Sequence, residues 1–346
     1  MKHLKSLFIT LALIALIASG CKDQESIVGF DNEPMTDMEA IQKLAAEDET
    51  LQSFDLNYNE DGTPKSILGK VSSEVYPVHF GQKMVLINRD LNIVIDGDSA
   101  SGVLTKTYEG TLFISASLDE FNWGDLNIVD TIIEKSFISV VTQNVKFEKS
   151  PGVRSGNGGN NGYGDGDGDG DCENLNECDD EYNGWRIVST SLPVGGTNGD
   201  NIYITNLTFY LPNDDTLSIN DPSSYFVDRE KGPKGIKQHR QMPSLAKFEE
   251  VKLSIEIKSK FEDPDYLSIS YGASVSAPLA SEKRLLDLVS SEFDGQYYTK
   301  VYEETFRTKN VSGNNHAVIT AIPKQVVHDS EAEVEEISWG LPYKVR

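Results

Sequence analysis

The chain has few cysteines, few basic residues and few long apolar runs. Its three cysteines, Cys21, Cys172 and Cys178, leave room for one disulfide at most. Lysine and arginine number 31 against 55 aspartate and glutamate residues, and the formal net charge is −24. Such a surface repels phosphate backbones, so nucleic acid is excluded as a partner.

Motifs that carry catalysis are missing too. The sequence has no HExxH metal pattern, no GxSxG elbow, no phosphate-binding loop and no dinucleotide glycine pattern. Carboxylates are too numerous for one acid–base pair to be singled out. His79, in "YPVHFG", is the first suspect for a catalytic residue, while a structural histidine among aromatic neighbours is the alternative. We therefore expect no required cofactor and, more generally, no enzyme.

One apolar run does occur, at the start of the chain. Residues 1–20 read "MKHLKSLFITLALIALIASG", with a basic beginning and an apolar stretch that is short for a bilayer span. This is the layout of a secretory signal peptide. No other segment of the sequence is apolar enough to cross a membrane.

The junction "IASGC" resembles the bacterial lipoprotein box. The resemblance implies that Cys21 is acylated and becomes the mature N-terminus, so that lipid is the membrane anchor. The following "KDQES" is similar to signals that send lipoproteins to the cell surface. We expect an outer-membrane lipoprotein of the cell envelope, displayed at the surface; a plain signal peptide with an ordinary cysteine is the alternative. Cys172 and Cys178 would then form a disulfide.

The length of the chain suggests two domains. Residues 21–35 are polar and predict a tether. Residues 36–54 predict a helix, because Thr36 and Glu39 form a capping box. Apolar residues recur at helical spacing and should cover a sheet; they are Met38, Ile41, Leu44, Ala45 and Leu51.

Beyond residue 66 the apolar period becomes two, as in strands. Leu91, Ile93 and Ile95 alternate with other side chains before a "DGD" turn. The segment 103–115 predicts two short strands broken at Gly110, residues 130–149 predict a long strand, and residues 184–194 predict another. One helix followed by long antiparallel strands indicates an α+β layer, a curved sheet folded over a helix.

These strands resemble the nuclear-transport-factor-like (SnoaL-type, cone-shaped) fold. The likeness covers residues 36–195 and includes a last hairpin with Phe147 and Lys149 on one strand and "WRI" from Trp185 on the other. It implies a domain over residues 36–198 with a pocket inside the cone. That family opens with three helices, and only one is evident here, so we expect a reduced pocket.

The second half predicts an all-β domain over residues 199–346. Val251, Leu253, Ile255 and Ile257 alternate, and further short strands follow with turn residues between them. The pattern favours an antiparallel β-sandwich. It resembles the immunoglobulin-like modules of secreted bacterial proteins in architecture alone.

A glycine- and aspartate-rich tract at 150–184 interrupts the predicted hairpin. Asp165, Asp167 and Asp169 occupy positions 1, 3 and 5 of a helix–loop–helix calcium pattern, but position 12 is Asn176, with Glu177 one residue late. The tract also resembles thrombospondin-type calcium repeats, in which cysteines pin the loop. Two roles stay open: a calcium site with the ligands Asp165, Asp167, Asp169, Asp171 and Glu177, or an acidic spacer.

Residues 229–241, "REKGPKGIKQHRQ", form a basic loop in an acidic chain. It is either a solvated loop or a contact for anionic glycan or for the acidic tract. Taken together, the sequence predicts a non-catalytic envelope lipoprotein that acts as a binding or structural module for a protein or glycan partner. The alternative is a small hydrolase or isomerase of the cone-fold class, using a pocket His or Asp.

Overall fold

The computed structural model describes residues 35–58, 65–66, 76–117, 129–149, 182–211, 215–229 and 242–346. The predicted signal peptide, Cys21, both other cysteines and all five predicted calcium ligands lie outside these ranges, as does the basic loop after Arg229. Residues 36–346 form one compact unit. Within the described ranges, no helix has the length and apolar character needed to span a membrane.

Three helices are described: α2 (Asp37–Glu47), α3 (Glu49–Tyr58) and α4 (Lys324–His328). The predicted capping box is confirmed, because the Glu39 amide donates to the Thr36 hydroxyl at 3.3 Å and the Thr36 amide donates to the Glu39 carboxylate at 2.9 Å. The single helix predicted over residues 36–54 is wrong. Asp48 is extended and breaks it, and its carboxylate accepts from the Leu51 amide at 2.9 Å, which caps α3.

The apolar stripe of these helices is largely as predicted. Ile41, Ala45 and Leu51 are buried, and Leu44 packs against their cluster. Met38 is exposed instead, because Ala40 takes the buried position in the first part of α2.

Most of the described chain is strand. In chain order the strands are β1 (Lys65–Ser66), β2 (Tyr76–Asp96), β3 (Ser99–Ser117), β4 (Thr131–Lys149), β5 (Trp185–Ser191), β6 (Val194–Gly196), β7 (Ile202–Tyr210), β8 (Thr216–Ile219), β9 (Phe226–Asp228), β10 (Ser244–Leu245), β11 (Glu250–Ser259), β12 (Tyr266–Tyr271), β13 (Glu282–Leu285), β14 (Asp287–Phe293), β15 (Tyr298–Arg307), β16 (Gly313–Ile322) and β17 (Ile337–Val345).

The strands form two sheets, antiparallel in the described pairings except for β10 beside β17. A 12-stranded sheet follows the order β1-β2-β3-β4-β6-β17-β16-β12-β13, with β5, β9 and β10 attached at its side. A five-stranded sheet follows the order β14-β15-β11-β7-β8. Most of the molecule is β structure, with a small helical part near its start. This confirms the expected order of an α+β region followed by β structure.

Strand β3 runs unbroken through Gly110, where we predicted a break. A Cβ atom at residue 110 would lie 2.4 Å from the Phe137 ring on β4. The glycine therefore makes room for an aromatic side chain on the neighbouring strand rather than ending its own strand. The predicted long strand is confirmed as β4, and Lys149 pairs with Trp185 of β5, so the two ends of the acidic tract are joined as a hairpin.

The large sheet crosses the boundary predicted between residues 198 and 199. Strand β6 pairs with β4 on one side and with β17 on the other. A Cβ atom on Gly195 would lie 2.1 Å from the Val140 carbonyl oxygen. This joint between the two halves of the sheet therefore requires a residue without a side chain.

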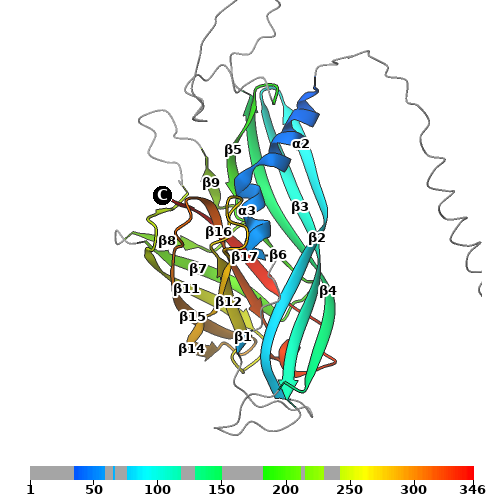
Figure 1. Cartoon of the computed structure of the whole chain (residues 1–346), viewed down its shortest axis with the longest axis vertical. Helices are drawn as coiled ribbons and strands as arrows, with labels where there is room; N and C mark the ends of the chain where they lie inside the picture. The colour runs from blue at the N-terminus through cyan, green and yellow to red at the C-terminus, as the bar shows by residue number, and fades with distance from the viewer. Residues whose placement is uncertain are drawn as a thin grey trace, which may run out of the picture. The chain divides into compact units, whose positions relative to one another are not determined.

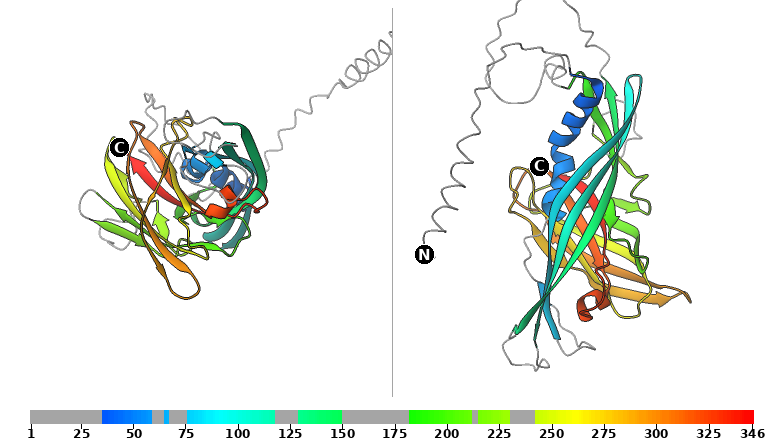
Figure 2. Two further views of the ribbon diagram at one scale, coloured as in Figure 1. Left: turned by 90° about the horizontal axis from the view of Figure 1, so that it is seen from below. Right: turned by 90° about the vertical axis from the view of Figure 1, so that its right-hand side faces the viewer.

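The sheet curves around α3, as the end-on view in Figure 2 shows. One side of α3 faces β3 and β4, and the other faces β16 and β17 (Figure 1). Two apolar clusters fill this interior, one around α2 and one around Phe54, Phe80 and Val318. The five-stranded sheet packs on the opposite face of β12, β16 and β17, where a third cluster unites the two sheets.

Candidate functional site

Helix α3 turns a polar stripe toward the sheet. Thr50, Ser53 and Asn57 are buried, and they alternate along the helix with buried Phe54 and Tyr58. The spacing of three and four places all five side chains on one face. A buried polar side chain is stable only when it is hydrogen-bonded, so this face requires partners from the surrounding strands.

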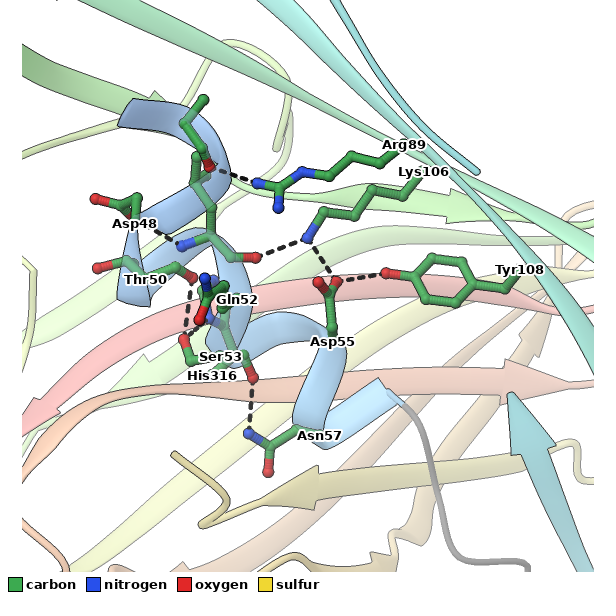
Figure 3. A network of polar contacts seen from close by, with 12 residues as sticks. Asp48, Thr50, Gln52, Ser53, Asp55, Asn57, Arg89, Lys106, Tyr108 and His316 are labelled. Atoms are coloured by element: carbon green, nitrogen blue, oxygen red, sulfur yellow. Dashed lines mark hydrogen bonds and ion pairs between the residues drawn. The ribbon is translucent and has the colours of Figure 1, made fainter. Parts of the chain in front are cut away.

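The first partners come from β3. The Lys106 ammonium donates to the Leu51 carbonyl at 2.6 Å and forms an ion pair with Asp55 at 2.5 Å, and the Tyr108 hydroxyl donates to the same carboxylate at 2.5 Å (Figure 3). Burial lowers the pKa of Lys106, and the nearby Asp55 charge opposes that shift. Burial also raises the pKa of Tyr108, so its hydroxyl stays a donor.

A second contact comes from β16. His316 Nδ1 and Ser53 Oγ share a hydrogen bond of 2.8 Å, and the Ser53 hydroxyl also donates to the Thr50 carbonyl at 3.0 Å. The His316 ring is fully buried and stands edge-on to Phe54. Burial lowers the pKa of His316 well below its ordinary value, with the charges of Lys106 and Arg229 acting in the same direction.

The C-terminal end of α3 is held by two further groups. The Tyr58 hydroxyl donates to the Glu336 carboxylate at 2.5 Å and lies 2.6 Å from the Ser139 hydroxyl of β4. Asn57 donates to the Ala273 carbonyl at 2.8 Å and accepts from the Ala273 amide at 3.0 Å. Burial and the Glu336 charge raise the pKa of Tyr58, which keeps it protonated.

A serine beside a histidine is the arrangement of a nucleophile and its base. Here both side chains lie between packed layers and have no exposed surface, so a substrate could reach them only after those layers separate. The network's evident role is to fix α3 between the two halves of the curved sheet.

His79 stands apart from this network. It lies on β2, opposite Ser115 of β3, and side chains of successive strand residues point to opposite faces. Because Phe80 faces the interior, His79 faces outward, where it is half-buried. Among the described residues it forms no hydrogen bond with a carboxylate, so the structure does not bring it together with a second catalytic group there.

Two clefts formed by described residues lie elsewhere on this unit. The larger has a volume of about 580 Å³ and is lined by residues 197–201, Phe261, Pro323, Gln325, Val326 and residues 332–335. The smaller, about 290 Å³, lies beside Tyr266, Leu286 and Tyr302. Neither is lined by the polar residues of α3 or by His79.

The described residues contain no group of three or more His, Cys, Asp or Glu side chains arranged to hold a metal ion. The five predicted calcium ligands lie outside the described part, so calcium binding by them stays a prediction.

Sequence reasoning missed the α3 network. Residues 50, 53, 54, 57 and 58 have the spacing of one buried helix face. Three of the five are polar, however, and a search for apolar periodicity does not find polar residues. Their partners, Lys106, Tyr108 and His316, lie on strands more than 45 residues away, and no local pattern connects them.

Comparison with known proteins adds no relative. No protein-family model matches the chain, and no curated protein sequence matches it.

Proposed function

We propose that the chain is a cell-envelope lipoprotein whose folded part acts as a non-catalytic binding or structural module. The observation that carries the proposal is the filled interior of the curved sheet. Side chains from α2, α3, β16 and α4 occupy the space that a cone-shaped enzyme would keep for its substrate. A packed interior leaves the outer clefts and faces as the places for a partner.

The anchor of the proposed lipoprotein is Cys21. Cells grown with an alkyne-bearing fatty acid should incorporate the probe into the parent chain and into Cys172→Ser, but not into Cys21→Ser. A parent chain that carries no label, although it is expressed and exported, would contradict the lipid anchor. Label retained by Cys21→Ser would contradict the assignment of the residue.

The finer fold assignment belongs to the same proposal. The position of α3 against a curved antiparallel sheet supports a nuclear-transport-factor-like arrangement for residues 36–198. Two sheets packed face to face support an immunoglobulin-like arrangement for residues 199–346. The shared strand pairing through β6 is a departure from two independent domains.

The last part of the proposed function is calcium binding by residues 165–178. Calorimetric titration of the full chain with CaCl2 distinguishes the two roles of the acidic tract. Heat at millimolar calcium that is lost in Asp167→Asn would identify a calcium loop of extracellular affinity. A flat titration would identify the tract as a spacer and remove calcium from the proposal.

The rival function, a small hydrolase or isomerase with His79 as its catalytic residue, requires His79 to face a pocket with an acid or base. The outward direction of His79 and the packed interior favour the binding module instead.

A further inference from the structure

The five-stranded sheet ends in a long open strand. Among the described residues, β14 pairs only with β15, so no described strand lies along its other side (Figure 1). Strand β14 has seven residues, whereas the other end strands of the two sheets, β1, β8 and β13, have two or four. Natural sheets usually keep their edge strands short, so β14 is the edge most open to a further strand.

The turn after β14 shows which of its backbone groups point to the open side. The Asp294 amide donates to the Tyr297 carbonyl at 3.0 Å, so these two residues form a hydrogen-bonded pair. Hydrogen-bonded and non-hydrogen-bonded positions alternate along an antiparallel pair. Phe293 and Ser291 therefore occupy non-hydrogen-bonded positions opposite β15, and their amide and carbonyl groups point away from it.

The inner face of β14 is apolar and uncovered. Leu288 lies opposite Tyr302, and Phe293 lies opposite Tyr298, on the side that β15 turns to the core. Tyr302 is buried, yet Leu288 is 37% exposed and Phe293 is 58% exposed. The cover over the inner face of β15 therefore does not extend to β14, and a segment beside β14 could bury these two side chains.

A cleft continues this uncovered face. Leu288 also lines the smaller cleft, of about 290 Å³, together with Leu285 and Leu286. Tyr266 and Leu267 of β12 form another part of its lining, because the short strand β13 pairs only with residues 268–271 and leaves the start of β12 without a neighbour there. The cleft therefore suits an apolar side chain from a segment that lies along β14.

The outer face of β14 is acidic. Asp287 and Glu292 lie opposite Glu303 and Thr299, on the side that faces solvent, and both are exposed. Neither forms an ion pair with a described residue, whereas Glu303 is paired with Lys252 at 2.8 Å. Opposite charges on neighbouring strands stabilise their pairing, so these two carboxylates favour a basic strand beside them.

The same features oppose pairing with a second copy of the chain. Two β14 strands side by side would bring Asp287 and Glu292 of both copies to one face, and like charges across a strand pair are destabilising. The net charge of −24 adds to this repulsion. The register shift between Leu288 and Ser290 is a bulge, and bulges also disfavour edge-to-edge pairing. The partner is therefore a different, positively charged segment.

We propose that β14 takes up an extended basic segment of a partner protein as a sixth strand of the five-stranded sheet. Its backbone pairs with Ser291 and Phe293. Its apolar side chains lie against Leu288, Phe293 and the smaller cleft, and the basic side chains between them lie beside Asp287 and Glu292. In strand addition of this kind, backbone hydrogen bonds supply affinity and side-chain pockets supply specificity. The inference rests on the proposed binding function and supplies its partner class.

Fluorescence anisotropy titration of the full chain in non-ionic detergent, at about 150 mM salt, tests this. The probe is a fluorescein-labelled KVKIKVK amide, in which basic and apolar residues alternate. The controls are KKVIVKK, which has the same composition without the alternation, and EVEIEVE, which reverses the charge. We expect the probe to bind at least about tenfold more tightly than either control.

The matched variants at the edge are Ser291→Pro and Ser291→Ala. Proline removes an amide that points to the open side and leaves the bonds to β15 in place, which an edge strand tolerates, whereas alanine keeps the amide. Ser291→Pro should weaken the probe by about tenfold or more, and Ser291→Ala should leave binding unchanged. An unchanged unfolding midpoint shows that the proline variant is still folded.

The charge is tested with Glu292→Gln and Glu250→Gln. Both remove a carboxylate from the outer face of the five-stranded sheet, but Glu250 lies on the central strand β11. Glu292→Gln should weaken the probe by about threefold, the size of an exposed ion pair, and Glu250→Gln should not.

Equal binding of KVKIKVK and KKVIVKK, or equal effects of the two Ser291 variants, would overturn the inference, since charge alone would then hold the peptide. Self-association of the chain that Ser291→Pro abolishes in sedimentation velocity would assign the edge to a second copy and overturn it too. These failures leave the fatty-acid labelling of Cys21 untouched, and a failure of labelling leaves the titration untouched. The two results therefore separate the partner class from the anchored lipoprotein.

Discussion

The two arms of the 12-stranded sheet are built from different sequence patterns. In the N-terminal arm, β2 to β4, one face is buried and the other faces solvent, and burial alternates residue by residue along β3 and β4. In the C-terminal arm, residues 315–322 of β16 are all buried, because α3 covers one face and the five-stranded sheet covers the other. Sheet strands covered on both sides lose alternation and become continuous apolar runs.

The comparison also explains where the polar network lies. Side chains that face solvent in the N-terminal arm need no protein partner. In the C-terminal arm both faces are inside, so each polar residue, such as His316 or Thr320, must find a hydrogen bond there. The polar residues that hold α3 come from the buried faces of both arms, Lys106 and Tyr108 on β3 and His316 on β16.

The most direct test of the difference between the two arms is to place the same charge on the outer face of each arm. Ile319→Asp in β16 should cost on the order of 5 kcal/mol or prevent folding, because Ile319 is fully buried between the sheets. Val103→Asp in β3, where the side chain is 43% exposed, should cost less than about 1 kcal/mol. Denaturant unfolding of both variants measures the difference, and similar losses would contradict the layered arrangement.

A buried ion pair gives the next largest effect. Lys300 and Asp265 form a fully buried pair at 2.8 Å where β15 faces the start of β12. Lys300→Met should destabilise the chain by about 3–5 kcal/mol, because it leaves the carboxylate without its partner. Lys252→Met is the control, since its pair with Glu303 is exposed and should contribute at most about 1 kcal/mol. Equal free energies of unfolding would show that the second sheet does not exclude water.

The joint between the arms can be tested by itself. Gly195→Val should cost about 3 kcal/mol or more, because the new side chain collides with the backbone of β4. Gly97→Asn provides the control. Its φ of +60° suits asparagine and a Cβ atom there meets nothing within 4 Å, so we expect a small change in the free energy of unfolding. A stable Gly195→Val chain would mean that the arms do not need β6.

The smallest expected effect is a dependence on pH. Since the pKa of His316 is lowered in the folded chain, the unfolded chain binds more protons once the pH falls below about 6.5. The stability that the neutral ring contributes is present above that pH and is lost below it, by at most about 1.4 kcal/mol per pH unit. Unfolding curves between pH 7 and pH 5 measure this slope.

His316→Gln should reduce that slope, and the part that remains comes from His328, whose pKa burial lowers to about 4. Ser53→Ala should lower stability at every pH but keep the slope, because the histidine is still buried. If the slope is as steep in His316→Gln as in the parent chain, His316 does not contribute to it.

Local patterns predicted much of the secondary structure. The alternation at Val251, Leu253, Ile255 and Ile257 identified β11, whose four residues are buried as expected, and Thr36 with Glu39 identified the start of α2. Gly110 misled because a glycine within a strand ends it in many proteins, and here it gives space to Phe137 on the next strand. The helical pattern over residues 36–54 places Asp48 inside one helix, yet its carboxylate caps α3.

The smaller cleft beside β14 could not be predicted in the same way. Its walls come from segments around Tyr266, Leu286 and Tyr302, and none carries a motif. Aromatic neighbours in the sequence make His79 a catalytic suspect, but the direction of its side chain depends on the register of β2 against β3.

By itself the sequence determined where strands form, where α2 begins and that a hairpin flanks the acidic tract, because these follow from side-chain periodicity and caps over a few residues. Only the tertiary structure decided that β12, β16 and β17 join the sheet of β2, β3 and β4 through β6. Backbone hydrogen bonds at a strand edge are alike for every sequence. Which strand pairs with a given edge is therefore determined by packing between distant segments, such as the close approach of Gly195 to Val140.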